Sequence, residues 1–281
     1  MRAWRTSPKR RIKQYCFDAF CIIACLLSLL GLLSILWSLI AHGLPAIHVD
    51  TITHNTPPPG QAGGLLNAII GTCIMTGLAI LIAAPFGIGI ATFLVDYSGK
   101  NRLAKSVRFV NDVLLSAPSI VIGLFVYVLI VEPMGHFSGL AGAIALAMIA
   151  LPMIVRATED VLYLVSPLLK EAAIAMGIAR WRVIFKIAYR VAIHGIITAV
   201  LLAVARIAGE TAPLLFTALN NQFGSSNLLK PMASLPVVIY QYAMSPYSTW
   251  QHLAWAGAIL ITAVILLLNL FARTIAKGSQ R

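Results

Sequence analysis

The sequence predicts an all-α membrane protein with six transmembrane helices, because it is strongly hydrophobic and contains long apolar segments. Hydrophobic residues make up 59% of the 281 residues and charged residues only 11%, whereas a soluble domain carries about 25% charged residues. A transmembrane helix needs about 20 predominantly apolar residues. The segments that meet this requirement are 17–40, 68–95, 113–131, 137–155, 191–216 and 254–272.

Lysine and arginine residues indicate how these segments are oriented, because they gather on alternate connections. Of the 21 basic residues, six lie in residues 1–13, four in 96–112, six in 156–190 and three in the C-terminal tail. The opposite connections 41–67 and 132–136 hold none. Cytoplasmic loops carry the excess of Lys and Arg, so we expect both termini in the cytoplasm. The net charge of +12 is divided among four blocks, which argues against a nucleic-acid-binding patch.

The first apolar segment, 17–40, follows a basic N-terminus as a secretory signal would. A cleavable signal has an apolar core of only about 7–15 residues, so we expect a membrane anchor that remains in the protein. Cys16, Cys21 and Cys25 lie beside or within this segment, and Cys73 lies in the second one. None has CxxC spacing, so we expect buried, reduced thiols and no metal or redox role.

Two features mark the connections expected on the outer side. His42, His48 and His54 are spaced six residues apart next to the sequence TPPPG. They are either loop residues at the membrane interface or metal ligands, and we favour the first interpretation because only Asp50 accompanies them. Residues 230–246 are apolar and aromatic but too short to span. We expect them to lie at the outer interface or to fold back into the bundle.

Prolines and glycines interrupt several predicted spans. Pro85, Pro118 and Pro152 each remove a backbone hydrogen bond and permit a kink. Such kinks are hinges in some transport proteins and are simply tolerated in other bundles. The second span also has a small-residue face suited to close helix packing. Its glycines are Gly71, Gly77, Gly87 and Gly89.

The basic connection 156–190 predicts a helix-turn-helix outside the membrane. Ser166 followed by Pro167 is typical of an N-cap and a first helical residue, and Gly177 is typical of a helix end. Glu171 lies near the helix start, where negative charge is favoured, and a second, basic helix leads back to the membrane. Either these helices lie on anionic lipid, or they dock a cytosolic protein; spacing alone favours neither.

Arg206 and Glu210 stand out in the fifth span, because each charge at a membrane centre costs about 2.5–3.5 kcal/mol on insertion scales. Four residues apart on a helix, they face the same side and can pair. The pair either locks helix packing or lines an anion path, in which guanidinium donors match the oxygens and Glu210 keeps the contact reversible. We favour the anion path. Thr211 adds a hydroxyl donor, and Pro213 is expected to end or kink the helix.

The sequence lacks the motifs of several enzyme classes. It has no G-x4-G-K-[ST] phosphate loop, since Gly99-Lys100 lacks both the upstream glycine and the following Ser or Thr. It also has no HExxH and no GxSxG motif. We therefore expect a chain that is not an enzyme and holds no cofactor. The energy for any active transport would then come from a partner that binds ATP.

The connection around Glu171 resembles the EAA loop of ABC importer permeases. EAAIAMG (Glu171 to Gly177), with Ile187 ten residues after the glycine, matches the first part of that pattern, whereas Tyr189 and Arg190 stand where leucine and proline are usual. The resemblance implies a type I ABC importer permease-like bundle with a cytoplasmic coupling helix that docks on an ATP-binding subunit. Its docking residues would be Glu171, Ala172, Ala173 and Gly177.

Three further stretches resemble the PstA family of phosphate permease subunits. They are ARxxGETAPLLFTA (205–218), SAPSIVIGLF (116–125) and LPMIVRATEDVL (151–162). The resemblance implies a subunit of an ATP-driven phosphate importer in the bacterial cytoplasmic (inner) membrane, with Arg206, Glu210 and Thr211 along the substrate path. The alternatives are sulfate or molybdate as the oxyanion, an ATPase-independent secondary transporter or channel, and a scaffold or sensor without transport.

The same resemblance implies partners and a domain organisation. The partners would be a second permease subunit (PstC-like), a dimer of ATP-binding subunits (PstB-like), a periplasmic or extracellular phosphate-binding protein (PstS-like) and membrane lipid. The expected domains are a basic cytoplasmic tail at 1–16, a first transmembrane helix with its outer loop at 17–64, the permease transmembrane domain at 65–275, and a cytoplasmic tail at 276–281. The coupling loop lies at about 166–190.

Overall fold

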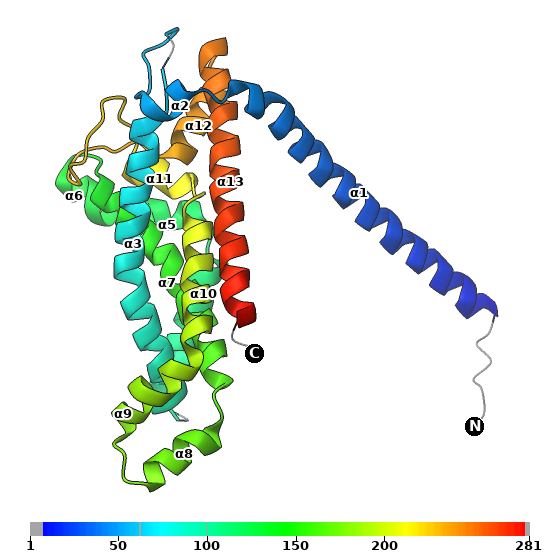
Figure 1. Cartoon of the computed structure of the whole chain (residues 1–281), viewed down its shortest axis with the longest axis vertical. Helices are drawn as coiled ribbons and strands as arrows, with labels where there is room; N and C mark the ends of the chain where they lie inside the picture. The colour runs from blue at the N-terminus through cyan, green and yellow to red at the C-terminus, as the bar shows by residue number, and fades with distance from the viewer. Residues whose placement is uncertain (1–7, 62, 100, 279–281) are drawn as a thin grey trace.

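The computed structural model describes residues 8–61, 63–99 and 101–278, with side chains from residue 13 to residue 275 in these ranges, and all regular elements in them are helical (Figure 1). Helices α3, α7, α10 and α13 lie side by side in a bundle. The α-helices are α1 Pro8–Ala46, α2 Val49–Thr53, α3 Leu66–Thr92, α4 Arg102–Ser116, α5 Ser119–Val126, α6 Glu132–Met134, α7 Gly139–Tyr163, α8 Pro167–Ala175, α9 Arg180–Val183, α10 Tyr189–Ile207, α11 Ala212–Thr217, α12 Leu235–Ala243 and α13 Ser248–Gly278. Three π-helical turns continue α3, α5 and α9, and they are η1 Phe93–Tyr97, η2 Tyr127–Val131 and η3 Ile184–Ala188.

Five continuous helical runs among the described residues are long and apolar enough to cross a membrane. They are Lys13–Ala46, Leu66–Tyr97, Gly139–Tyr163, Arg180–Ile207 and Ser248–Ile275. A bent pair, Arg102–Ser116 with Ser119–Met134, makes a sixth crossing if its two halves are taken together. The predicted all-α membrane class is therefore confirmed.

The third predicted span, 113–131, is wrong as a single straight helix. The chain bends by 106° between α4 and α5, with Ala117 in an extended conformation (φ −69°, ψ 134°). Pro118 explains the break, because its ring disfavours helical conformation at the residue before it. The residues before Pro118 therefore belong to α4, which carries the basic side chains of this connection, and only the residues after it belong to the apolar α5.

The fifth predicted span, 191–216, is also wrong as a single helix. Helix α10 ends at Ile207, and α11 begins at Ala212 with Pro213 in its first turn. A proline inside a continuing helix would lack its hydrogen bond to Gly209 and would clash with that carbonyl. The expectation that Pro213 ends or kinks the helix therefore agrees with the structure, and the break falls between 208 and 211.

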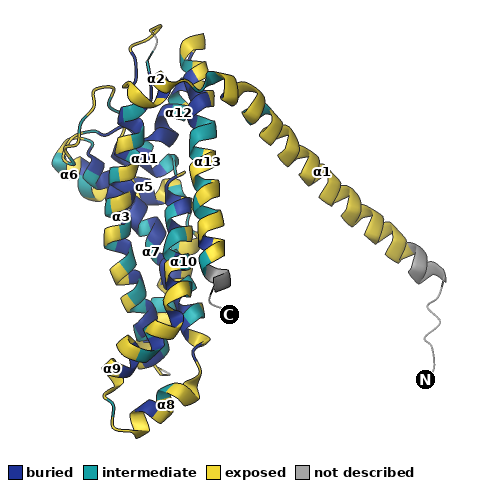
Figure 2. Cartoon of the chain, viewed as in Figure 1, coloured by how far each residue is buried: buried dark blue, intermediate teal, exposed yellow. Residues whose placement is uncertain are grey.

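The core of the bundle lies where α3 packs along α7, and close backbone contact makes this possible. A Cβ placed on Gly87 would lie 2.8 Å from a side-chain atom of α7, and one placed on Gly71 would lie 2.0 Å from the carbonyl oxygen of Ala233. Gly77 and Gly89 have open space instead. The predicted small-residue face therefore packs at two of its four glycines. Figure 2 shows α7 buried among the other helices.

Helix α1 diverges from the bundle, and its side chains are exposed along most of its length (Figure 2). Its C-terminal end packs against α13, where His42 stacks on Trp255 with ring centroids 4.9 Å apart. Cys16, Cys21 and Cys25 lie on the exposed part of α1. Cys73 on α3 is exposed as well. The expectation of buried thiols is therefore wrong. These cysteines lie on apolar helix faces that point away from the protein, as faces in contact with lipid do.

The apolar stretch 230–246 folds back into the bundle, which is one of its two expected outcomes. It forms α12, whose Val237 and Val238 are completely buried. The N–H of Leu235 donates to Oγ1 of Thr72 on α3 (2.8 Å), and α12 contacts α13 on another side. This short helix therefore packs against both α3 and α13.

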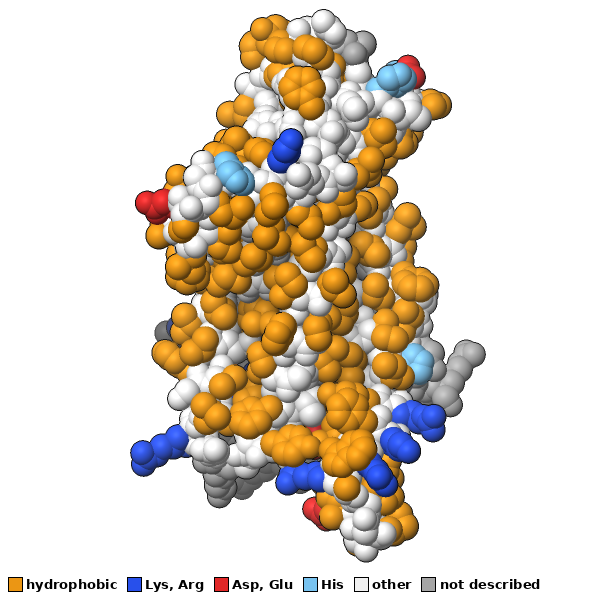
Figure 3. Space-filling view, turned by 90° about the vertical axis from the view of Figure 1, so that its left-hand side faces the viewer, with side chains coloured by type: hydrophobic (Ala, Val, Ile, Leu, Met, Phe, Trp, Pro, Cys, Tyr) orange, Lys and Arg blue, Asp and Glu red, His pale blue; other side chains and the backbone are white. Residues whose placement is uncertain are grey.

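Charged side chains gather at one end of the molecule. Figure 3 shows hydrophobic side chains over the middle of one face and most of its Lys and Arg side chains near the lower end, which carries α8 and α9. Because an apolar surface band is what lipid tails require, the bundle is suited to a membrane in which this basic end emerges on one side.

Candidate functional site

The loop between α7 and α10 forms a short helix that projects beyond the bundle (Figure 1). Helix α8 begins at Pro167 after the N-cap Ser166 and ends at Ala175. Gly177 then adopts a left-handed conformation (φ +81°), and its N–H donates to the carbonyl of Ile174 (2.9 Å). Glycine adopts this conformation without a Cβ penalty, so the sequence ends the helix here. The helix-turn-helix expected from the sequence is present.

The four residues expected to form the docking surface divide between two faces of α8. Glu171, Ala172 and Gly177 are exposed, whereas Ala173 is 2% exposed and faces the interior. Large apolar side chains on the exposed side, such as Leu168 and Met176, are about three-quarters exposed. The exposed face therefore combines a carboxylate with apolar surface, and Ala173 supports it from behind.

A buried ion pair joins α8 to the end of α3, and the sequence analysis missed it. Nζ of Lys170 lies 2.7 Å from Oδ1 of Asp96, and the two side chains are 15% and 8% exposed. The guanidinium of Arg180 donates to the carbonyl oxygen of Asp96 and lies over the ring of Tyr97. Asp96 directly follows the apolar segment 68–95. A single carboxylate at the edge of a predicted span was the only sequence feature that indicated this site.

A second ion pair joins α4 to α7 close to the same place. Nε of Arg108 donates to Oε1 of Glu159 (2.8 Å), and its Nη2 donates to the hydroxyl of Tyr163 (2.8 Å) and to the carbonyl of Leu94 (3.1 Å). Glu159 is 5% exposed. This pair also escaped sequence reasoning, because its partners are 51 positions apart.

Arg206 and Glu210 pair across the end of α10 rather than along a continuous helix. Nη2 of Arg206 lies 3.5 Å from Oε1 of Glu210, with side chains 58% and 15% exposed. Arg206 lies in the last turn of α10, where the helix dipole favours a cation. Glu210 lies in the following turn, and its backbone N–H donates to the carbonyl of Ile207 (3.2 Å). The Arg206 side chain therefore keeps more than half of its surface open in the single chain.

The helix that follows Glu210 is wedged into the bundle. Thr211 is partly buried just before α11, and Pro213 within α11 is buried. A Cβ on Gly123 of α5 would lie 2.6 Å from Cα of Pro213, so the two backbones are in direct contact. The sequence-predicted path residues Arg206, Glu210 and Thr211 thus lie together at a helix break held by close packing.

One helical run connects the exposed loop to this break. The run Arg180–Ile207 comprises α9, η3 and α10, and at 1.5 Å per residue its 28 residues extend about 40 Å. One continuous helical run and a short turn therefore connect α8 to Arg206.

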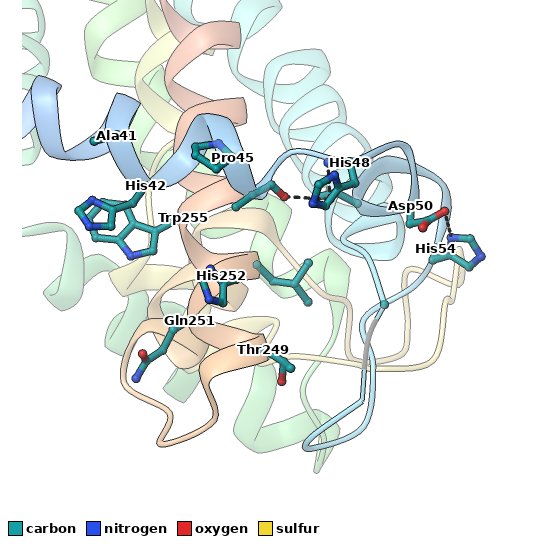
Figure 4. A pocket seen from close by; sticks show the side chains of 14 residues that line it. Ala41, His42, Pro45, His48, Asp50, His54, Thr249, Gln251, His252 and Trp255 are labelled. Carbon is teal, nitrogen blue, oxygen red and sulfur yellow. Dashed lines mark hydrogen bonds and ion pairs between the residues drawn. The ribbon is translucent and has the colours of Figure 1, made fainter.

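A pocket lies at the opposite end, between the end of α1, α2 and the start of α13. It has a volume of about 1000 Å³ and is lined by His42, His48, His54, His252 and Trp255 among others. Figure 4 shows these histidines spread around the pocket instead of converging on one point. Nδ1 of His54 lies 3.6 Å from Oδ1 of Asp50, four residues earlier in the chain. Within the described part of the chain, no three His, Cys, Asp or Glu side chains gather as metal ligands would.

Comparison with known proteins gives agreement in sequence and in fold. The family model of the binding-protein-dependent transport system inner membrane component matches residues 83–281. The chain is 55% identical over 251 residues, 89% of both chains, to the phosphate transport system permease protein PstA of Haemophilus influenzae. It is 52% identical over 94% of both chains to the protein of the same name from Pasteurella multocida. It is 36% identical to the probable PstA protein of Methanocaldococcus jannaschii, over 86% of this chain and 85% of that one.

Two solved transporters share the fold at low sequence identity. A chain of a bacterial alginate ABC transporter superposes with a TM-score of 0.64 at 16% identity, over 96% of both chains. A chain of the MetNI methionine ABC transporter in an inward-facing conformation has a TM-score of 0.60 at 18% identity, over 76% of this chain and 94% of that one. At this level of identity the likeness shows the fold alone. Together with the sequence matches, it establishes that the chain belongs to the family of binding-protein-dependent transport system inner membrane components.

Proposed function

We propose that the chain is the permease subunit of an ATP-driven phosphate importer and that an ATP-binding partner drives it through α8. The relatives that are 55% and 52% identical over the aligned residues are phosphate transport system permeases, which supports phosphate as the substrate. The observation that carries the mechanism is the helical run Arg180–Ile207, which joins the exposed α8 to the Arg206–Glu210 pair.

The open guanidinium of Arg206 is the element proposed to meet the anion. Its planar donors match the oxygens of phosphate, and its side chain is 58% exposed in the single chain. A second permease subunit facing this side would complete a path around it. Glu210 at 3.5 Å holds part of the positive charge, which keeps binding weak enough for the anion to leave. Thr211 supplies a further hydroxyl at the same break.

The proposed partners follow from the two ends of the molecule. The exposed Glu171 face of α8 would dock on an ATP-binding subunit of the PstB kind. The second permease would be PstC-like, and a PstS-like binding protein would deliver phosphate on the other side. The basic end that carries α8 would face the cytoplasm together with both termini, as the distribution of Lys and Arg predicts. The chain holds no phosphate-loop motif of its own, so ATP would bind only to the partner.

Uptake of labelled phosphate by cells with Arg206→Gln tests the path. We expect uptake to be lost while the amount of chain in the membrane stays normal, because the change removes the anion donor from an exposed position. The matched control is Arg190→Gln, which removes an exposed arginine from the beginning of the same helix and should leave uptake intact. Wild-type uptake by Arg206→Gln cells would reduce Arg206 to a packing residue.

Co-purification with the ATP-binding subunit tests the coupling. Charge reversal by Glu171→Lys should abolish co-purification, whereas Arg190→Gln should not. Transport by the chain in vesicles that contain no ATPase would instead support an ion-gradient secondary transporter. Competition by sulfate or molybdate at equal concentration would assign the path to another oxyanion.

A further inference from the structure

Three cations from three different elements meet at the C-terminal end of the α3–η1 run. Lys170 of α8 pairs with the Asp96 carboxylate at 2.7 Å, and Arg180 of α9 donates to the Asp96 carbonyl. Arg108 of α4 donates to the carbonyl of Leu94 at 3.1 Å. A helix C-terminus leaves carbonyls without intrahelical partners and carries partial negative charge. This end of α3 is therefore a common attachment point for the loop and for α4.

Asp96, in the η1 turn that continues α3, contacts both Lys170 and Arg180 of the exposed loop. Its side chain is 8% exposed, and that of Lys170 is 15% exposed. A cavity of about 170 Å³ lies beside this ion pair. It is lined by Asp96, Lys170, Glu171 and Arg180 among others. The Lys170–Asp96 ion pair and the Arg180 hydrogen bond therefore lie in the wall of this cavity, where part of the boundary is not closed by apolar packing.

The position of Lys170 connects this tie to the docking face. Lys170 immediately precedes Glu171, so the side chain that reaches inward and the one that lies on the exposed face belong to adjacent residues of α8. Any displacement of the Glu171 face must move Lys170, and with it Asp96. Since α3 packs along α7 for most of its length, a displacement of Asp96 would move the core of the bundle. The same displacement of α8 would also move α10 through the continuous chain.

We propose that Asp96 is a positioning residue for energy coupling. It holds α8 through Lys170 and Arg180 in the arrangement that meets the ATP-binding partner, and it passes displacement of α8 to α3. This inference rests on the proposed function, and it adds a second route from the docking face into the bundle beside the covalent one through α10. A merely structural ion pair would affect the amount of folded chain but not the yield of transport per ATP.

The test compares variants of the whole importer in proteoliposomes with the binding protein and ATP supplied. Asp96→Asn and Lys170→Gln should each lower the amount of phosphate transported per ATP hydrolysed, by about fivefold or more on the scale of ordinary coupling free energies. Co-purification with the ATP-binding subunit should persist, because neither variant changes Glu171 or the other exposed side chains of α8. The charge swap Asp96→Lys with Lys170→Asp should recover part of the ratio, and it keeps the test valid if one single variant folds poorly.

The control is Asp160→Asn, which removes an exposed carboxylate paired with Arg156 at 3.7 Å on α7 and should leave the ratio unchanged. A wild-type ratio in both Asp96→Asn and Lys170→Gln would overturn the role of Asp96 while leaving the proposed function intact. Absence of phosphate transport by the wild-type complex would overturn the proposed function itself. Loss of uptake in proportion to folded complex, with the ratio unchanged, would show that Asp96 is only structural.

Discussion

The two ion pairs near the ends of the helical run Arg180–Ile207 differ in geometry and burial. Lys170 and Asp96 are 2.7 Å apart with side chains only 15% and 8% exposed, whereas Arg206 and Glu210 are 3.5 Å apart with the arginine 58% exposed. A buried pair that loses one partner leaves an uncompensated charge, so it holds one arrangement. An exposed pair exchanges partners at little cost, so it can release its arginine to a ligand. Burial, rather than the presence of charge, therefore separates the anchor from the candidate path.

Removal of the buried carboxylate should give the largest loss of stability. Asp96→Ala leaves Lys170 without its partner at a buried site, and the free energy of unfolding should fall by about 3–5 kcal/mol. Denaturant titration of the purified chain in detergent measures this change. Asp160→Ala removes a carboxylate that is 62% exposed, and it should change stability by about 0.5 kcal/mol or less. Equal effects of the two variants would mean that burial does not separate them.

The next largest effect is expected where α5 meets α11 below the candidate path. In Gly123→Ala the new Cβ would lie 2.6 Å from Cα of Pro213, so one backbone must move, and overpacking of this kind costs about 1–3 kcal/mol. The control Gly89→Ala adds the same atom where no neighbour lies within 4 Å. In that control the free energy of unfolding should rise by about 0.5–1 kcal/mol, because alanine favours the helix more than glycine does. If Gly123→Ala behaved like its control, α11 would not be wedged.

Sequence reasoning succeeded where structure depends on neighbours along the chain. The apolar segments, the start of α8 at Pro167 and the turn at Gly177 that follows α8 agree with local hydropathy, capping and backbone preference. It failed where distant residues decide. Asp96 and its partner are 74 positions apart, and nothing in the pattern says which of several cations the carboxylate meets. The inward face of Ala173 depends on what α8 packs against. Pro118 indicated a kink, but the 106° angle follows from the packing of both halves.

A smaller effect is expected at the turn that ends α8. Gly177 has φ +81°, and an alanine there costs about 1–2 kcal/mol because its Cβ crowds the neighbouring carbonyl. Gly177→Ala should therefore lower stability by about that amount and weaken co-purification with the ATP-binding subunit. Gly177→Asn is the control, since asparagine tolerates this conformation better, and it should lose less on both measurements. Equal losses would indicate that the contact, rather than the turn, is affected.

The smallest effect on stability is expected at the residue whose loss should abolish uptake. Arg206 is 58% exposed and its partner lies 3.5 Å away, so Arg206→Gln should lower the free energy of unfolding by about 1 kcal/mol or less. Arg190→Gln should change it equally little. The combination of near-normal stability with lost uptake would separate Arg206 from Asp96, whose removal affects both. If Arg206→Gln destabilised the chain as strongly as Asp96→Ala, the pair at the end of α10 would be a lock between helices, and the anion path would have to lie elsewhere.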